Sequence, residues 1–127
     1  MTSPPATPRL FVFQCSGNTY MECIEQSVFG SNDPWPLQVR AGDACLLHHY
    51  EYDTLFGLWC ATTDGGRRLV PKAWAGKFPF QVRIALATPS MVELPKGTMG
   101  PAERIIEGQR AQAVLDHLLP PQHPARS

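Results

Sequence analysis

The sequence predicts an α+β domain built on a strongly curved sheet of five or six strands, with one early helix and one C-terminal helix. Three observations support this class. Short apolar stretches of strand type occupy most of residues 9–95, turn signals separate them, and helical spacing of apolar residues occurs only near the two ends of the chain. Strands do not alternate with helices, as a parallel α/β sheet would require. A small barrel is one form that such a curved sheet can take.

The first predicted elements are a strand and a helix. Residues 9–15 (RLFVFQC) are short, aromatic and β-branched, which indicates a buried strand. A helix is expected to begin at GNT, where Asn18 or Thr19 can cap it, and to stop at Phe29–Gly30, because glycine accepts the left-handed conformation that ends many helices. The residues that recur at helical spacing within it are Met21, Ile24, Glu25 and Val28.

A loop and a hairpin are expected next. The prolines of SNDPWP, residues 31–36, exclude regular structure from the loop. Residues 42–52 (GDACLLHHYEY) and 54–63 (TLFGLWCATT) predict two adjacent strands joined by a tight turn at 52–54. The sequence DGG at 64–66 is a second turn signal.

The second half of the chain predicts further strands. RRLVPKAWAGK, residues 67–77, predicts a short edge strand that runs into a loop, because Pro71 lacks the N–H that a sheet needs. FPFQVRIALA, residues 78–87, predicts a long strand, and MVELP, residues 91–95, predicts one more short strand. The side chains of the long strand that are expected to face the core are Phe80, Val82 and Ile84.

The last predicted element is an amphipathic helix over residues 100–119, which Gly108 weakens in its middle. Its apolar stripe consists of Ile105, Ile106, Val114, Leu115, Leu118 and Leu119. A chain of 127 residues suits one core, so a single domain is expected over 9–119, with proline-rich tails at 1–8 and 120–127.

Charge and cysteine usage restrict the functional classes. The chain has 11 basic and 11 acidic residues, whereas a protein that grips long duplexes through many phosphates usually has a basic excess. No apolar run reaches the ~20 residues of a membrane span. An intracellular, cytoplasmic protein without membrane contact is therefore expected. The cysteines, expected to be reduced and mostly buried because they lie in apolar segments without a CxxC pair, are Cys15, Cys23, Cys45 and Cys60.

The sequence favours neither a metal site nor an enzyme. His48 and His49 are adjacent on a predicted strand and point to opposite faces, so one ion cannot easily take both as ligands. No nucleophile elbow of the GxSxG kind occurs. We therefore expect a protein without catalytic residues, metal or cofactor.

Four segments in a fixed order carry a resemblance to a known family. FVFQCSGNTYMECI, VFG, LLHHYEYDTLFGLWCATTDGG and PKAWAGKFPFQVRI resemble the DCD domain, the "development and cell death" module of plant proteins, over residues 9–92. The matching positions are Glu22–Cys23, Phe29–Gly30, Leu55–Phe56–Gly57, Ala61, Gly65–Gly66, Pro71, Ala73–Trp74, Phe78–Pro79 and Gln81–Val82–Arg83. Where the family usually has FGLP, this chain has FGSND, so a differently shaped loop is expected after the first helix.

The resemblance implies a fold and a kind of ligand. DCD domains look like members of the PUA-like superfamily, together with the PUA, EVE, YTH and ASCH domains. That kinship implies a small, strongly bent, mixed β-barrel flanked by helices. Relatives bind RNA, or a modified base in DNA or RNA, between the exit loop of the first helix and the barrel, and in YTH domains the pocket is an aromatic cage. Function does not follow from fold alone, so the residues must be weighed directly.

Aromatic residues in or beside loops are the first candidates for such a pocket, because a flipped or single-stranded base needs flat ring faces around it. Phe29, Trp35 and Trp74 are the predicted walls. For Trp35 and Trp74 an equal alternative is a lid that covers the ends of the sheet. Trp59 and Phe56 lie inside the predicted hairpin and are expected in the core.

Polar residues supply the candidate groups for reading a base edge. Asn18 offers both a donor and an acceptor, although a helix cap or turn is its more frequent role. Gln81 and Arg83 share one face of their strand, where Gln81 can face a base and Arg83 can hold a phosphate. Their structural alternatives are hydrogen bonds from Gln81 to neighbouring backbone and an ion pair of Arg83 with Glu22 or Glu25.

A basic cluster surrounds the Trp74 loop. A local positive rim beside an aromatic residue suits a phosphate-flanked base even in a neutral chain, although the same residues can simply be a solvated edge. The predicted phosphate contacts are Arg67, Arg68, Lys72 and Lys77.

The sequence thus predicts a binding module that recognises RNA or DNA through one base, with a modified or flipped base as the favoured form. A protein–protein interaction adaptor of stress or cell-death type, binding a peptide through the hairpin edge and loops, is the alternative. An enzyme on the same scaffold has the least support.

Overall fold

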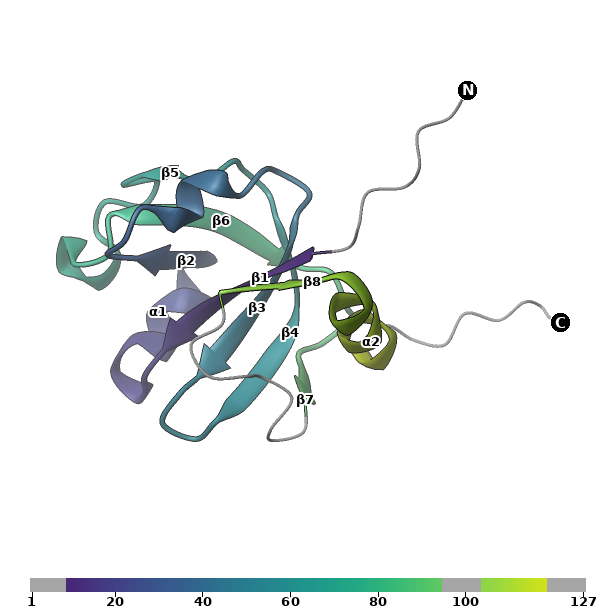
Figure 1. Ribbon diagram of the computed structural model, residues 1–127. Helices are drawn as coiled ribbons and strands as arrows, with labels where there is room; N and C mark the ends of the chain where they lie inside the picture. Colours follow the sequence, from purple (N-terminus) through teal and green to yellow (C-terminus); the bar gives the residue numbers. More distant parts are fainter. Residues whose placement is uncertain (1–8, 95–103, 119–127) are drawn as a thin grey trace, which may run out of the picture.

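A computed structural model describes residues 9–94 and 104–118 of the chain (Figure 1). Strands dominate it, with one helix early and one at the end. The elements in chain order are β1 (Arg9–Cys15), α1 (Gly17–Glu25), β2 (Val28–Ser31), the 3₁₀ turn η1 (Trp35–Gln38), β3 (Ala44–His49), β4 (Thr54–Ala61), β5 (Gly66–Arg67), the 3₁₀ turn η2 (Ala73–Gly76), β6 (Phe80–Leu86), β7 (Val92–Leu94), β8 (Ile105–Glu107) and α2 (Gly108–Leu118).

The strands form one mixed, eight-stranded sheet with the order β2-β6-β4-β3-β1-β8, in which β5 pairs with β6 and β7 with β4. Only β1 and β3 run parallel, and the other pairings are antiparallel. The α+β class with two helices is confirmed, but the sheet has more strands than the five or six expected. Within the described residues no ladder joins β2 to β8, so this sheet is not closed into a barrel.

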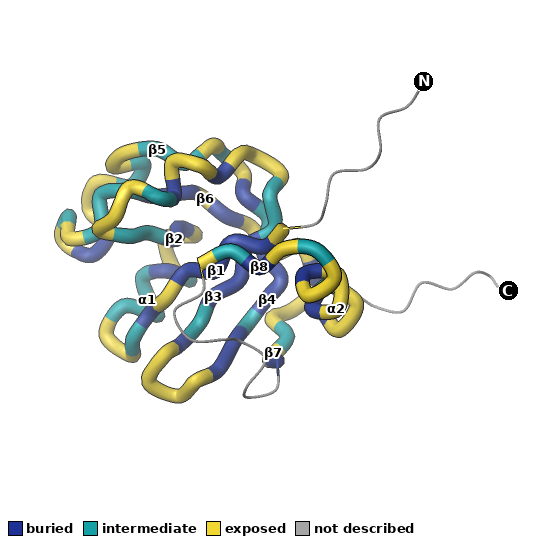
Figure 2. Tube along the Cα trace, viewed as in Figure 1, coloured by how far each residue is buried: buried dark blue, intermediate teal, exposed yellow. Residues whose placement is uncertain are grey.

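Both faces of the central strands are buried. Alternate residues of β1 point in opposite directions, so Phe11 and Phe13 enter one core while Leu10 and Val12 enter the other. The first core also holds Phe29, Trp59 and Val82, and the second lies between the sheet and α2 (Figure 2). Residues of the second core include Leu46, Leu55, Ile106, Val114 and Leu118. Burial on both faces explains why RLFVFQC is an almost continuous apolar run.

The first helix is shorter than predicted. It ends at Glu25, and Ser27 adopts a left-handed backbone with φ of 52°. Val28–Ser31, expected to end the helix, instead form β2, with Phe29 opposite Val82 of β6. Aromatic and β-branched residues gain more from a half-buried ladder than from a helix terminus, so tertiary pairing overrides the helical spacing here.

The C-terminal helix is also shorter than predicted. Ile105–Glu107 form β8, in which Ile106 pairs with Leu10 of β1. Gly108, expected merely to weaken the helix, has φ of 68°, and α2 runs from Gly108 to Leu118. The predicted helical residues 100–103 and 119, Pro95 of the predicted last strand, and both predicted tails lie outside the described residues.

Most of the other predicted elements are confirmed: β1 has the predicted bounds, β3 and β4 form the predicted hairpin, and β6 and β7 lie within the predicted strand segments. The edge strand predicted from residue 67 is limited to β5, which begins in the predicted turn at Gly66. The loop 31–36 was expected to lack regular structure, but it contains the last residue of β2 and the first two residues of η1. All four cysteines are free, and three of them are buried. Among the described residues, no helix is long and apolar enough to cross a membrane.

Candidate functional site

A cavity of about 310 Å³ opens where β1 ends, α1 begins and the loop from β2 to η1 passes by. Its size falls at the lower end of the range for small-molecule sites. Its lining is mixed, with an aromatic wall, several uncharged polar side chains and few charges. The lining residues are Val12, Gln14, Cys15, Ser16, Thr19, Gly30, Ser31, Asn32, Asp33, Trp35, Tyr50, Phe78 and Arg104.

Trp35 forms the main aromatic wall of this cavity. Its ring packs on Phe13, with centroids 4.5 Å apart, and lies nearly parallel to Phe11. The guanidinium of Arg104 lies 5.7 Å from its ring centroid. The indole Nε1 is buried and has no hydrogen-bond partner in the described part of the chain. Trp35 is therefore a half-buried ring held by the core on one side, which suits a stacking wall.

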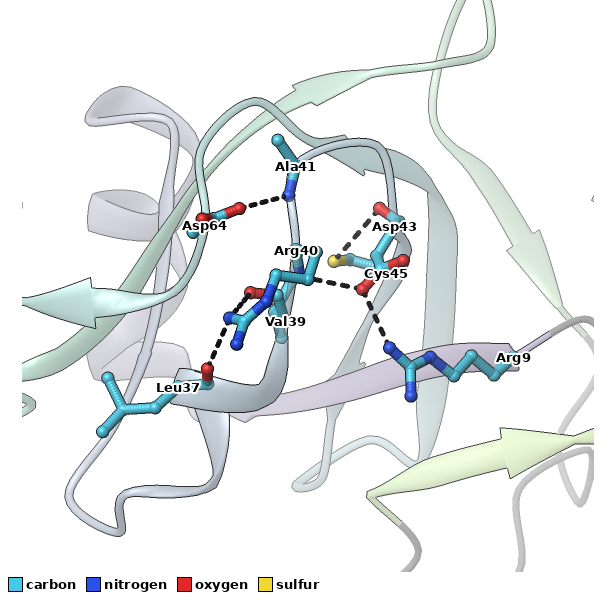
Figure 3. Close-up of polar contacts among 8 residues, drawn as sticks. All are labelled: Arg9, Leu37, Val39, Arg40, Ala41, Asp43, Cys45 and Asp64. Atoms are coloured by element: carbon cyan, nitrogen blue, oxygen red, sulfur yellow. Dashed lines mark hydrogen bonds and ion pairs between the residues drawn. The ribbon is translucent and has the colours of Figure 1, made fainter. Parts of the chain in front are cut away.

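The segment after η1 is held by a polar network, which includes a hydrogen bond from the Arg40 guanidinium to the carbonyl of Leu37 in η1 (Figure 3). The Asp43 carboxylate accepts the backbone N–H of Arg40 at 2.8 Å and pairs with Arg9 at 3.4 Å. Asp64 accepts the N–H of Ala41 at 3.0 Å. These contacts connect the segment both to β1 and to the turn after β4.

The start of α1 forms another side of the cavity. Ser16 occupies the N-cap position, which the sequence had suggested for Asn18 or Thr19, and its N–H donates to Thr19 Oγ1 at 2.9 Å. The Glu51 carboxylate at the tip of the hairpin accepts the N–H of Gly17 at 2.7 Å. The hairpin tip and the helix start are thereby held together beside the cavity.

The electrostatic character of the cavity is close to neutral. Asp33 and Arg104, its two formally charged lining residues, form an ion pair at 3.4 Å. Cys15 also lines the cavity, but burial, and secondarily the Glu51 carboxylate, raises the pKa of its thiol to about 12. Burial likewise raises the pKa values of Cys23 and Cys45. These thiols stay protonated near neutral pH, and a protonated thiol is a poor nucleophile.

Only one of the three predicted aromatic walls lines this cavity. Phe29 is fully buried and packs on Phe13 and Trp59 in the first core. Trp74 is 5% exposed; its backbone N–H donates to Glu22 and its indole N–H donates to the carbonyl of Thr19. The prediction that Phe29 and Trp74 form walls therefore needs correction, because packing against the core and α1 covers both rings. Trp59, expected in the core, lies there.

The predicted polar readers lie elsewhere. Asn18 is exposed on α1 and does not line the cavity. Gln81 is 1% exposed, and its amide makes hydrogen bonds of 2.7–3.2 Å to the backbone of Val70 and Phe78. Arg83 is exposed beside Val28 of β2 and also lies away from the cavity. Gln81 thus follows its structural alternative, and neither Gln81 nor Arg83 lines the cavity.

The four predicted phosphate contacts are all exposed, but none lines the cavity. Arg67 lies over the ring of Phe80, with its guanidinium carbon 5.0 Å from the centroid. Lys77 directly precedes Phe78, which does line the cavity. Of the four basic residues, Lys77 is thus the one adjacent in sequence to a lining residue.

Several lining residues were missed by reasoning from the sequence. Gln14 is an exposed polar residue inside an otherwise apolar strand, and this was a usable signal. Asn32 belongs to the FGSND departure, so the unusual loop does form part of the site. Tyr50 had a weak signal, because on the predicted strand it shares a face with His48 and Tyr52 that is a plausible stacking surface. Arg104 gave no local signal, because its position depends on how β8 pairs with β1.

The fold and the cavity define a small α+β domain with a ligand-sized cavity beside its first helix. The chain belongs to the development and cell death (DCD) domain family, whose model matches residues 10–102. It is similar to the DCD domain-containing protein NRP-B of Glycine max, with 31% identity over 84 residues, covering 58% of this chain and 26% of that protein. The B2 protein of Daucus carota is 31% identical over 84 residues, covering 58% of this chain and 41% of that protein. The chain thus spans well under half the length of these relatives.

Proposed function

We propose that this domain is a non-enzymatic binding module that holds one base of a nucleic acid, modified or flipped out of its strand, in the cavity beside α1. The observation that carries the proposal is the combination of one aromatic wall, packed on the core, with uncharged polar side chains around a space of about 310 Å³. A base needs a ring face to stack on and donors and acceptors at its edge. Trp35 offers the ring, while Gln14 and Asn32 offer amides.

The proposal includes the finer fold assignment. The bent sheet with β6 shared between its two parts supports a PUA-like domain, even though the described strands leave the sheet open. In that superfamily the ligand lies between the exit loop of the first helix and the barrel, and the contribution of Asn32 and Asp33 to the cavity supports a similar placement here. The protonated Cys15 thiol in the cavity favours binding over covalent chemistry.

We also propose that the basic cluster of Arg67, Arg68, Lys72 and Lys77 contacts phosphates of the bound strand. A strand leaving the cavity past Phe78 would reach Lys77 first and then Lys72, with Arg67 and Arg68 beyond them. For single strands, log affinity falls as log salt rises, and each lost phosphate contact makes this slope less steep by about 0.7. We expect the Lys72→Ala, Lys77→Ala double variant to show this smaller slope, whereas an unchanged slope would remove these lysines from the interface.

The test of the proposal is a titration with hexanucleotides of RNA and of DNA, plain and with one methylated adenine or cytosine. Binding is followed through the indole N–H resonance of Trp35, assigned by its loss in Trp35→Phe. We expect saturable shifts with at least one hexanucleotide, and an affinity about tenfold lower for Asn32→Ala, which removes a hydrogen-bonding amide.

Asn18→Ala is the matched control for this experiment. Asn18 is an exposed asparagine of α1 that lies outside the cavity, so its removal should leave the affinity unchanged. Equal losses in Asn18→Ala and Asn32→Ala would contradict the assignment of the cavity. No shift with any of the hexanucleotides would contradict nucleic-acid binding itself.

A second candidate function is a protein-interaction adaptor, and one observation favours it. A groove of about 320 Å³ beside the end of β6 is lined mainly by apolar side chains, among them Trp59, Ile84 and Leu86. Leu86 is 43% exposed and Met91 is 37% exposed at this groove. An extended peptide with an apolar side chain is the partner that such a groove fits. Leu86→Ser should leave hexanucleotide binding unchanged and would separate the two functions.

A further inference from the structure

The rim of the cavity carries a second aromatic residue whose ring is free to stack. Tyr50 lines the cavity and is 54% exposed. Tyr52, two residues further along the same hairpin tip, is 68% exposed but packs on the ring of His49, with centroids 4.7 Å apart. Within residues 9–94 and 104–118, the ring of Tyr50 contacts no other aromatic ring. The hairpin tip, exposed in Figure 2, thus presents one unoccupied ring at the mouth of the cavity.

The backbone of Tyr50 is held firmly. Its N–H donates to the carbonyl of Cys15 at the end of β1 at 3.1 Å, and its carbonyl accepts the N–H of Asp53 at 3.4 Å. Asp53 in turn lies 3.0 Å from His48 Nε2. Glu51 is bonded to the N–H of Gly17 on α1. Because neighbouring residues fix the tip on both sides of Tyr50, little backbone entropy is lost when a ligand stacks on its ring.

The charges around the cavity restrict what kind of ligand carries the base. A free nucleotide brings a phosphate dianion, which needs an unpaired cation close by. Arg104, the cation among the described lining residues, is already paired with Asp33, and Lys77, although it precedes the lining residue Phe78, does not line the cavity itself. A phosphodiester inside a strand carries a single charge and can leave the cavity into solvent. An isolated base enclosed in the cavity would also leave the exposed ring of Tyr50 without a stacking partner.

From these observations we infer that the ligand is a single-stranded nucleic acid, in which one base enters the cavity and the neighbouring base stacks on Tyr50. This inference rests on the proposed function and extends it from one base to a strand. The strand would stack on Tyr50 at the hairpin tip and extend past the lining residue Phe78 toward Lys77.

The experiment compares a nucleoside with a hexanucleotide that contains it. Both probes, made from the base that gives the largest shift of the Trp35 indole resonance, are titrated into the wild-type protein and into Tyr50→Ala, Tyr50→Phe and Tyr52→Ala. Stacking on an aromatic residue strengthens single-strand binding by roughly tenfold or more per base. We expect the wild type to bind the hexanucleotide at least about tenfold more tightly than the nucleoside.

The variants decide whether Tyr50 is responsible. Tyr50→Ala should lose most of the advantage of the hexanucleotide over the nucleoside, while Tyr50→Phe and the matched control Tyr52→Ala keep it. Equal losses in Tyr50→Ala and Tyr52→Ala, or a hexanucleotide no tighter than the nucleoside, overturn the inference while leaving the base pocket standing. If neither probe shifts the Trp35 resonance, the proposed function and the inference both fall. Thermal unfolding of each variant checks that these exposed substitutions leave the fold intact.

Discussion

At the scale of single residues, several conspicuous polar groups hold the protein together and are therefore not free for a ligand. Gln81 is the clearest case, because its amide satisfies both the N–H and the carbonyl of Val70 and also the carbonyl of Phe78. This side chain fixes the loop of residues 68–79 onto β6. A buried amide with all its groups bonded is costly to replace.

Gln81→Leu tests this role. The substitution keeps the size of the side chain but leaves the N–H and carbonyl of Val70 without partners in a buried site, so we expect a loss of about 2–3 kcal/mol in the free energy of unfolding. Urea denaturation measures it. Gln38→Leu, at an exposed position of η1, is the control and should change stability by less than about 0.5 kcal/mol. Similar values for the two variants would contradict the structural role of Gln81.

The Cys15 thiol predicts a dependence of stability on pH. Its pKa is about 12 in the folded protein against an ordinary value of 9.0. Below pH 9 both states are protonated; above it the unfolded thiol releases its proton while the folded thiol keeps it, so the free energy of unfolding falls as pH rises. Compared with Cys15→Ala, the wild type should lose stability between pH 8.5 and 10.5 by up to ~1.4 kcal/mol per pH unit. Urea denaturation at several pH values measures this. If the free energy of unfolding changed with pH by the same amount in both proteins, the prediction would be contradicted.

At the scale of elements, the turn after β4 packs closely against η1. A Cβ on Gly65 would lie 1.8 Å from the carbonyl oxygen of Pro36, and the N–H of Gly65 donates to Val39 at 2.9 Å. Gly30, in β2, allows a similar approach, because a Cβ there would lie 2.6 Å from the Trp74 ring. Both positions require glycine because a Cβ would clash with these neighbouring atoms. The DGG sequence therefore marks a close backbone contact as well as a turn.

Gly65→Ala and Gly66→Ala form a matched pair for this contact. At Gly65 the new methyl meets backbone that cannot move without displacing η1, so we expect a loss of at least ~2 kcal/mol in the free energy of unfolding. At Gly66 the nearest atom is the end of the Leu69 side chain at 3.0 Å, which can shift, so the loss should be clearly smaller. Thermal unfolding measures both, and an equal loss would contradict the close contact at Pro36.

At the scale of the whole molecule, two cores share the central strands. The first lies under the cavity and contains Phe13 and Trp59, and the second lies under α2 and contains Leu46 and Leu118. A Cβ on Gly57 would lie 3.1 Å from Leu118, so the helix sits directly on the sheet. Because β1, β3 and β4 contribute to both cores, the helix at the end of the chain supports the strands that shape the distant site.

Leu118→Ala tests this coupling. Removing a buried leucine costs ~2–4 kcal/mol of unfolding free energy, and both cores should unfold in one transition. During urea denaturation, tryptophan fluorescence follows the first core, which holds Trp59 and Trp74 with Trp35 packed against it, while circular dichroism follows the whole fold, including α2. Leu37→Ala, at a leucine that is 39% exposed, is the control with little expected effect. Two separate transitions would show that the cores are independent.

The sequence predicted the strands better than the helices. β1, the hairpin of β3 and β4, and β6 follow from alternation and turn residues, which are local properties. β2 and β8 were expected as helix, because their spacing fits either structure and only their pairing with β6 and β1 selects the strand. For the site, Trp35 was predicted and lines the cavity, whereas Gln14, Tyr50 and Arg104 come together only through long-range pairing.

By itself, the sequence determined the fold class, the family and the kind of residue from which a site could be built. It could not determine which aromatic and polar side chains remain free, since that depends on partners distant in the chain. Trp74 and Trp35 both lie in loops with prolines nearby, yet the carbonyl of Thr19, 55 residues away, binds the indole of Trp74. Trp35 keeps an unbonded indole at a cavity wall. Local pattern fixes which way a side chain points along its element, and only tertiary packing decides what it meets there.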